Sequence, residues 1–260
     1  MDRTAPADSD PLQVRDLDGP DTGVRVLTLN RPARRNALDT GLLRRLAAEL
    51  DRAGGDPRTR AILLRGEGPA FCAGGDVKEF AGIPDALDHM TVRARLLADV
   101  LVALQRHPHP VVAAVDGAAL GGGAALALAA DVVVATPAAE FGFPEFGASV
   151  VPTVVLPLLV RQVRPKLAFD LLTTGRRLDA AAALRDGLVS RVSAPGRHVT
   201  EALAVARAWA AVAPEVARET KRLACLAGAS TIEDAMTAGL EVTAATWRPG
   251  VERGRASGPC

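Results

Sequence analysis

The chain has 260 residues, of which 48% are hydrophobic, and its 31 Lys and Arg residues against 30 Asp and Glu leave a formal net charge of +1. This length allows one large domain, or one domain with a small appendage, built around a sizeable core. The near-neutral balance gives no support to binding of nucleic acid or of a membrane surface. The three cysteines, Cys72, Cys225 and Cys260, show neither disulfide nor metal-ligand spacing. We therefore expect a cytoplasmic protein without a metal site.

The predicted elements divide the chain into three parts. Residues 1–20 are rich in Asp and Pro and are predicted to form a flexible N-terminal arm. Residues 21–195 alternate between predicted strands and helices and indicate an α/β core, whereas residues 196–260 are predicted to be all helical. In chain order, the apolar periodicity predicts strands at 24–29, 61–64, 111–115, 132–134 and 188–192, a strand or loop at 140–145, and helices at 40–51, 77–80, 85–106, 153–163, 165–174, 179–186, 198–212, 214–227 and 231–247.

Two strand-to-helix loops carry runs of glycine. Gly74-Gly75 opens the predicted helix at 77–80, and Gly121-Gly122-Gly123 follows the buried strand at 111–115 and leads into an alanine-rich helix. Glycine lets the backbone approach another atom closely, and the first amides of a helix have no partner within it. Each run alone could equally be a tightly packed turn. Together, two such loops could hold one oxygen from two sides, as in an oxyanion hole.

Several motifs in order resemble the crotonase (enoyl-CoA hydratase/isomerase) superfamily over about residues 24–195. The resemblance implies a spiral of ββα units, a C-terminal helical region that forms a homotrimer or a dimer of trimers, and an acyl-CoA thioester as substrate, with no separate cofactor. The motifs are Leu29-Asn30-Arg31-Pro32, Arg35-Asn36-Ala37-Leu38, Phe71-Cys72-Ala73-Gly74-Gly75-Asp76, Pro110-Val111-Val112-Ala113-Ala114-Val115-Asp116-Gly117, Leu120-Gly121-Gly122-Gly123, Phe141-Gly142-Phe143-Pro144-Glu145 and Leu171-Leu172-Thr173-Thr174-Gly175.

The resemblance also implies residue roles. The amides of Gly75 and Gly122 would form the oxyanion hole and stabilise an enolate of the thioester. The pantetheine and adenine would run past two loops, with Arg34, Arg35 and Lys78 as candidate phosphate contacts. The expected substrate- and CoA-binding residues are Arg34, Arg35, Ala37, Leu38, Ala73, Gly74, Asp76, Lys78 and Gly121.

The chain departs from the family's hydratases at one acidic position. Hydratases use two glutamates to place water across a double bond; the first falls on Ala125 and the second on Glu145. A single glutamate at the second position is what the family's Δ3,Δ2-enoyl-CoA isomerases use to carry a proton between carbons. We therefore expect Glu145 to act in isomerisation, with its pKa raised by the neighbouring phenylalanines 141, 143 and 146.

Two alternatives stay open. Branched apolar residues at 152–159 replace a Gly-Gly-Thr run and resemble some methylglutaconyl-CoA hydratase-like members, which keeps hydration as an outcome. The missing acid at position 125 also allows a non-catalytic acyl-CoA-binding homologue. The end of the chain, 248–255, lacks the aromatic-and-lysine pattern that often reaches a neighbour's CoA in this family.

The remaining polar side chains are expected to have structural roles. Asp76 and Asp116 are predicted to fix loops through backbone hydrogen bonds, and Glu140 to lie at the surface. Cys72 is expected to be packed rather than nucleophilic. His107 and His109, which flank prolines at a helix end, are expected to face solvent.

Overall fold

The computed structural model describes residues 10–17, 23–79, 81, 83 and 86–246. Its centre is a six-stranded sheet in the order β1-β2-β3-β4-β6-β9. Neighbouring strands run parallel, except that β1 pairs antiparallel with β2. The strands of this sheet are β1 (Leu12–Asp16), β2 (Val24–Leu29), β3 (Ala61–Gly66), β4 (Val111–Val115), β6 (Val132–Ala135) and β9 (Arg191–Val192).

A second sheet of three short strands, in the order β5-β7-β8, completes the α/β architecture. The chain passes from β4 into β5 and then into α3, so a strand of each sheet and a helix form one ββα unit, as the resemblance implies. The strands are β5 (Ala118–Leu120), β7 (Glu140–Gly142) and β8 (Leu178–Asp179). The helices are α1 (Thr40–Gly55), α2 (Ala86–Arg106), α3 (Gly122–Leu128), α4 (Leu156–Gln162), α5 (Pro165–Thr174), α6 (Ala180–Arg185), α7 (His198–Ala210), α8 (Pro214–Ala227) and α9 (Ile232–Thr246), with single 3-10 turns at η1 (Pro32–Arg34) and η2 (Phe146–Ala148).

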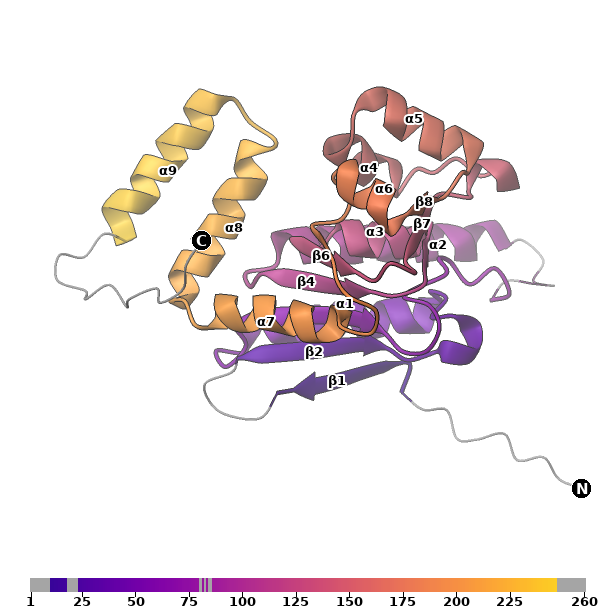
Figure 1. Cartoon of the computed structure of the whole chain (residues 1–260), viewed down its shortest axis with the longest axis horizontal. Helices are drawn as coiled ribbons and strands as arrows, with labels where there is room; N and C mark the ends of the chain where they lie inside the picture. Colours follow the sequence, from indigo (N-terminus) through magenta and orange to yellow (C-terminus); the bar gives the residue numbers. More distant parts are fainter. Residues whose placement is uncertain (1–9, 18–22, 80, 82, 84–85, 247–260) are drawn as a thin grey trace, which may run out of the picture.

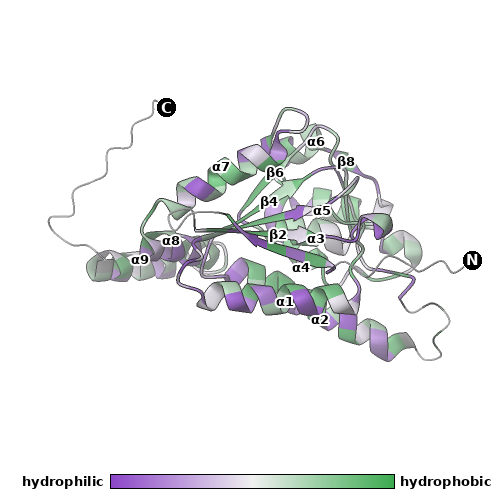
Figure 2. Cartoon of the chain, turned by 90° about the horizontal axis from the view of Figure 1, so that it is seen from below, coloured by the Kyte–Doolittle hydropathy of each residue, from purple (hydrophilic) through white to green (hydrophobic). Residues whose placement is uncertain are grey.

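The central strands supply side chains to two hydrophobic cores, one on each face of the sheet. On β3, Ile62 and Leu64 enter the core that α1 and α2 cover, while Ala61 and Leu63 enter the core that α7 covers. Figure 2 shows α1 and α2 on one side of the strands and α7 on the other. Although α7 lies beyond the predicted boundary at residue 195, it is therefore part of the α/β core.

Two helices, α1 and α2, cover one face of the central sheet. The side chain of Asp39 accepts a hydrogen bond of 2.7 Å from the amide of Leu42 and caps α1. The apolar residues of α1 recur on one face and are buried, which fixes the start of this helix against the sheet. On α2, the buried residues cluster towards its C-terminal end at Val100, Leu101 and Leu104.

The last two helices extend away from the core (Figure 1). One buried lysine ties α8 back to it: the ammonium of Lys221 lies 2.8 Å from a carboxylate oxygen of Asp131 and donates a 2.8 Å hydrogen bond to the carbonyl of Leu104. On α9, Ile232, Met236 and Leu240 recur every four residues, form one stripe and are each more than 60% exposed. Of the helices in the described part of the chain, none is both long and apolar enough to cross a membrane.

Several expectations are wrong in detail. Within the predicted arm, Leu12–Asp16 is strand β1, because its backbone continues the sheet at the edge of β2; residues 1–9 and 18–20 lie outside the described residues. Val77–Glu79 forms turns rather than the start of a helix. The strand predicted at 188–192 shrinks to Arg191–Val192, and the two-residue strand β8 was not predicted.

The histidines near residue 108 are also placed differently from the prediction. His107 is buried, since its Nε2 donates a 3.0 Å hydrogen bond to the carbonyl of Leu50 on α1, and its Nδ1 accepts one of 3.1 Å from the amide of His109. Burial lowers the pKa of both imidazoles, that of His109 to about 4. This pair therefore helps to join the ends of α1 and α2 instead of facing solvent.

Candidate active site

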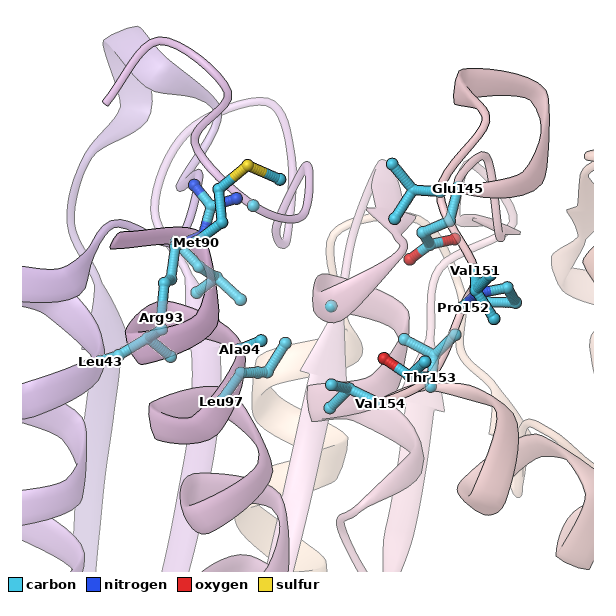
Figure 3. A pocket seen from close by; sticks show the side chains of 15 residues that line it. Leu43, Met90, Arg93, Ala94, Leu97, Glu145, Val151, Pro152, Thr153 and Val154 are labelled. Atoms are coloured by element: carbon cyan, nitrogen blue, oxygen red, sulfur yellow. The ribbon is translucent and has the colours of Figure 1, made fainter. Parts of the chain in front are cut away.

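One pocket of about 180 Å³ gathers the three residues that were predicted to be catalytic, Gly75, Gly122 and Glu145. Figure 3 shows its two walls: Met90, Arg93, Ala94 and Leu97 of α2 on one side, and Glu145 with the segment 151–154 on the other. The pocket is lined by Leu38, Leu43, Gly75, Met90, Arg93, Ala94, Leu97, Gly122, Glu145, Val150, Val151, Pro152, Thr153, Val154 and Val155.

The amide of Gly75 is directed away from the strand-like contact that holds its loop. Leu38 pairs with Gly75 as in a parallel ladder, with its amide 2.8 Å from the carbonyl of Gly74 and its carbonyl 2.9 Å from the amide of Asp76. In such a pairing the amide of the middle residue faces the opposite way. Within the described residues, no backbone or side-chain acceptor bonds to the amide of Gly75. This amide is therefore available at the pocket.

The amide of Gly122 is available for a different reason. Gly122 is the first residue of α3, and the first amide bonded within this helix is that of Ala125, which donates to the carbonyl of Gly121. Gly121 itself has a φ of +50° and a ψ of −121°, a conformation that suits glycine. A Cβ on Gly122 would lie 2.8 Å from the Cδ2 of Leu97, so a larger residue here would require the side chain of Leu97 to move.

Backbone hydrogen bonds fix the two loops relative to each other. The amide of Cys72 donates to the carbonyl of Ala118 at 3.0 Å, and the amide of Leu120 donates to the carbonyl of Cys72 at 2.9 Å. A Cβ on Gly74 would come within 3.7 Å of the nitrogen of Gly122, which shows how closely the loops approach. Gly75 and Gly122, whose amides are both available, thus line one pocket.

Glu145 lies next to these amides, on the turn that follows β7. A Cβ on Gly121 would be 2.6 Å from its Oε1, and its Oε2 is buried without a hydrogen-bond partner in the described structure. Burial raises the pKa of Glu145, and a hydrogen bond from its own backbone amide offsets part of this rise. Phe141 and Phe143 are buried as expected, but Phe146 is 55% exposed. Glu145 therefore has the environment of a general base rather than that of a surface carboxylate.

The residue at the other acidic position of hydratases offers no acid. Ala125 is fully buried in α3. Among the described residues that line the pocket, Glu145 is the single carboxylate. The described residues also contain no group of three His, Cys, Asp or Glu side chains that could hold a metal ion.

The residues expected to contact CoA fall into two groups. Arg34, Arg35 and Lys78 are exposed. Leu38 lines the pocket, and Ala37, Ala73, Gly74 and Gly121 lie within two residues in sequence of the lining residues Leu38, Gly75 and Gly122. The carboxylate of Asp76 is buried and held by the protein itself: it lies 3.0 Å from the guanidinium of Arg31 and accepts a 3.1 Å hydrogen bond from the amide of Lys78. Asp76 therefore fixes its loop, which is the structural role that was predicted for it beside CoA binding.

The other side chains with predicted structural roles are placed as expected. Asp116 accepts hydrogen bonds from the amide of Gly117 and the hydroxyl of Thr136. Glu140 is exposed and pairs with Arg177 at 2.8 Å. Cys72 is fully buried, which raises the pKa of its thiol to about 12.

Arg93 is the pocket residue that the sequence analysis missed. It occupies the pocket-facing stripe of α2 between Met90 and Leu97, at helical spacing. A charged residue within an otherwise apolar stripe is a signal that could have singled it out. Thr153 adds a hydroxyl to the opposite wall (Figure 3).

Comparison with known proteins agrees with this geometry. The family model for enoyl-CoA hydratase/isomerase matches residues 20–246. An enoyl-CoA hydratase of Mycobacterium tuberculosis is 38% identical over 193 residues, which cover 73% of this chain and 72% of the relative. The crystal structure of an enoyl-CoA hydratase from Mycobacterium smegmatis aligns with a TM-score of 0.85 at 33% identity over 91% of each chain. That of an enoyl-CoA hydratase from Bacillus anthracis aligns with a TM-score of 0.85 at 27% identity, over 91% of this chain and 90% of the other.

The fold, the paired glycine loops and these matches lead to one conclusion: the chain belongs to the enoyl-CoA hydratase/isomerase family.

Proposed function

We propose that the protein isomerises an enoyl-CoA thioester by moving a proton between two carbons through a bound enolate. The observation that carries this proposal is a single carboxylate with a raised pKa, Glu145, in the same pocket as the available amides of Gly75 and Gly122. The thioester oxygen would lie between the two amides. Exposed Arg34, Arg35 and Lys78 surround the loops along which the CoA phosphates would run.

In the proposed reaction, the carboxylate of Glu145 removes a proton from C2 of a 3-enoyl-CoA. The electron pair of the broken C–H bond delocalises over the diene and onto the thioester oxygen, which accepts hydrogen bonds from Gly75 and Gly122. Glu145 then returns the proton to C4, which gives the 2-enoyl-CoA with no atom gained or lost. One carboxylate is enough for this exchange, and its raised pKa suits both removal and return of the proton.

Hydration is the second candidate, because the relatives reported above are named enoyl-CoA hydratases. A hydratase must also hold and activate a water molecule. The alanine at position 125 cannot do so, which makes hydration the less favoured reaction. A protein that binds acyl-CoA without turnover would be the outcome if neither reaction is observed.

The test of the assignment is Glu145→Gln. We expect kcat for isomerisation to fall by about 10²–10⁴-fold, the usual contribution of a general acid–base group, with little change in KM. Glu140→Gln is the matched control, since Glu140 is five residues away, exposed and paired with Arg177. Isomerase turnover that survives Glu145→Gln unchanged would remove Glu145 from the mechanism.

A further inference from the structure

Arg93 reaches from α2 across the loop that carries Gly75. Its side chain is 16% exposed, and its Nη1 donates a 2.6 Å hydrogen bond to the carbonyl of Asp76. A Cβ on Gly75 would lie 3.2 Å from Nη2 and 3.3 Å from the central carbon of the guanidinium. The charged group of Arg93 therefore packs against the side of Gly75 on which another residue would carry its Cβ.

The loop is held on its other side by a second arginine. Arg31 donates to the carboxylate of Asp76, pairs with Asp39 at 2.9 Å and donates to the carbonyl of Ala37. Arg31 thus joins the Asp76 loop to the cap of α1, whereas Arg93 joins the same loop to α2. Both attachments are made to Asp76, the residue that follows Gly75.

Glu79 completes the contact with Arg93. Its Oε2 lies 3.5 Å from Nη1 of Arg93, and its Oε1 accepts a 2.8 Å hydrogen bond from the amide of Thr40 at the start of α1. Glu145 is the carboxylate among the described residues that line the pocket. Through its two oxygens, Glu79 links the guanidinium of Arg93 to the start of α1.

The position of the Gly75 amide and the charge of Arg93 would both act on the enolate oxygen. An oxygen that accepts a hydrogen bond from Gly75 gains negative charge as the enolate forms, and it would do so next to the guanidinium. In a partly buried site, a cation within a few ångströms of a developing anion stabilises that anion more than bulk water allows. An amide that is already held in place also stabilises the enolate oxygen, because it does not have to reorient when the negative charge forms.

We propose that Arg93 is a positioning residue for the oxyanion hole: it seats the amide of Gly75 and adds positive potential where the enolate oxygen forms. This role rests on the proposed enolate chemistry and goes beyond it by assigning a function to the acyl-pocket wall. α2 then serves two purposes, since Leu97 and Met90 shape the pocket while Arg93 controls the amide that polarises the carbonyl.

The test compares Arg93→Met with Arg95→Met. Methionine keeps much of the apolar stem without the charge, and Arg95 is a matched control on the same helix because its side chain is 80% exposed and pairs only across one turn with Asp99. The probe is acetoacetyl-CoA, a β-ketoacyl thioester whose enolate has its own ultraviolet absorbance. The measurement is the pH at which half of the bound probe is ionised.

We expect wild type and Arg95→Met to lower that pH relative to free acetoacetyl-CoA. Arg93→Met should lose about tenfold or more in the enolisation constant, less than the 10²–10³-fold effect of deleting a direct oxyanion donor. For turnover, kcat should fall by a similar factor while KM changes less than threefold. Arg93→Lys keeps the charge but not the planar fork, so its loss should be smaller than that of Arg93→Met.

The outcomes separate the two proposals. If wild type stabilises the bound enolate and Arg93→Met does so equally, the role of Arg93 is wrong while the proposed function stands. If wild type does not stabilise the enolate, the proposed function fails and the role of Arg93 with it. If Arg93→Met does not fold, Arg93→Lys decides. An unchanged enolisation constant together with an unchanged kcat would contradict the proposed positioning by the planar guanidinium. A loss in both, with KM retained, would support it.

Discussion

At the side chain of Glu145, the ionised form that the proposed reaction needs is also the form that destabilises the folded protein. Its carboxylate is placed against Gly121 with one buried oxygen unpartnered, which raises its pKa. Since the ionised form is the one that removes a proton, kcat/KM should rise with pH through this raised pKa. The same ionisation is unfavourable in the folded protein, because the unfolded chain solvates the charge fully.

The difference in stability between wild type and Glu145→Gln should therefore depend on pH. A folded pKa above the ordinary value of 4.5 means that the folded protein binds more protons than the unfolded chain, so its stability falls as pH rises from that value through the raised pKa. Glutamine removes this loss. We expect the variant to melt at a higher temperature than wild type at pH 8 and at about the same temperature below pH 4 in thermal unfolding. A difference that is largest at low pH would contradict the burial of an ionisable group here.

Among the elements, α8 is attached to the core through the buried ammonium of Lys221. Lys221 contacts Asp131, which also accepts a 2.7 Å hydrogen bond from the amide of Val111 at the start of β4. Burial raises the pKa of Asp131, whereas the positive charge of Lys221 lowers it. Lys221 therefore stabilises the ionised form of Asp131.

Removing one member of this pair should therefore be costly. Lys221→Met removes a buried ammonium that pairs with the partly exposed carboxylate of Asp131 and donates to the carbonyl of Leu104, and it should lower the free energy of unfolding by about 1.5–3 kcal/mol. Arg222→Met, at a half-exposed neighbour on α8, should change it by less than about 1 kcal/mol. Denaturant unfolding of both variants checks this, and equal effects would show that Lys221 does not anchor the helix.

Secondary-structure elements differ in how well the sequence predicts them. Long apolar runs such as Val111–Val115 predicted the buried strands, because a local pattern is enough to indicate them. The paired glycine loops, together with the resemblance, led to the candidate site residues Gly75, Gly122 and Glu145. The two-residue strand β8 depends on its pairing with β7, and the edge strand β1 on its antiparallel pairing with β2, and no local periodicity reports either pairing. His107 was misplaced for the same reason, since its partner, the carbonyl of Leu50, lies 57 residues away.

For the whole molecule, the exposed stripe of Ile232, Met236 and Leu240 on α9 is an unburied apolar face. We propose that copies of the chain bury it in a trimer or a dimer of trimers. Sedimentation should then give a mass of three or six times the 27.0 kDa chain, and Met236→Glu with Leu240→Glu should shift it towards a single chain. A monomeric wild type at micromolar concentration would contradict the proposed assembly.

The central claim concerns which reaction the pocket performs, and one ratio tests it most directly. With acyl chains of equal length, kcat/KM is measured for conversion of a 3-enoyl-CoA to the 2-enoyl-CoA and for hydration of the 2-enoyl-CoA. A pocket with one carboxylate and no acid at position 125 should favour isomerisation by about 100-fold or more, the scale of one general acid–base group. Hydration that equals or exceeds isomerisation would contradict the account.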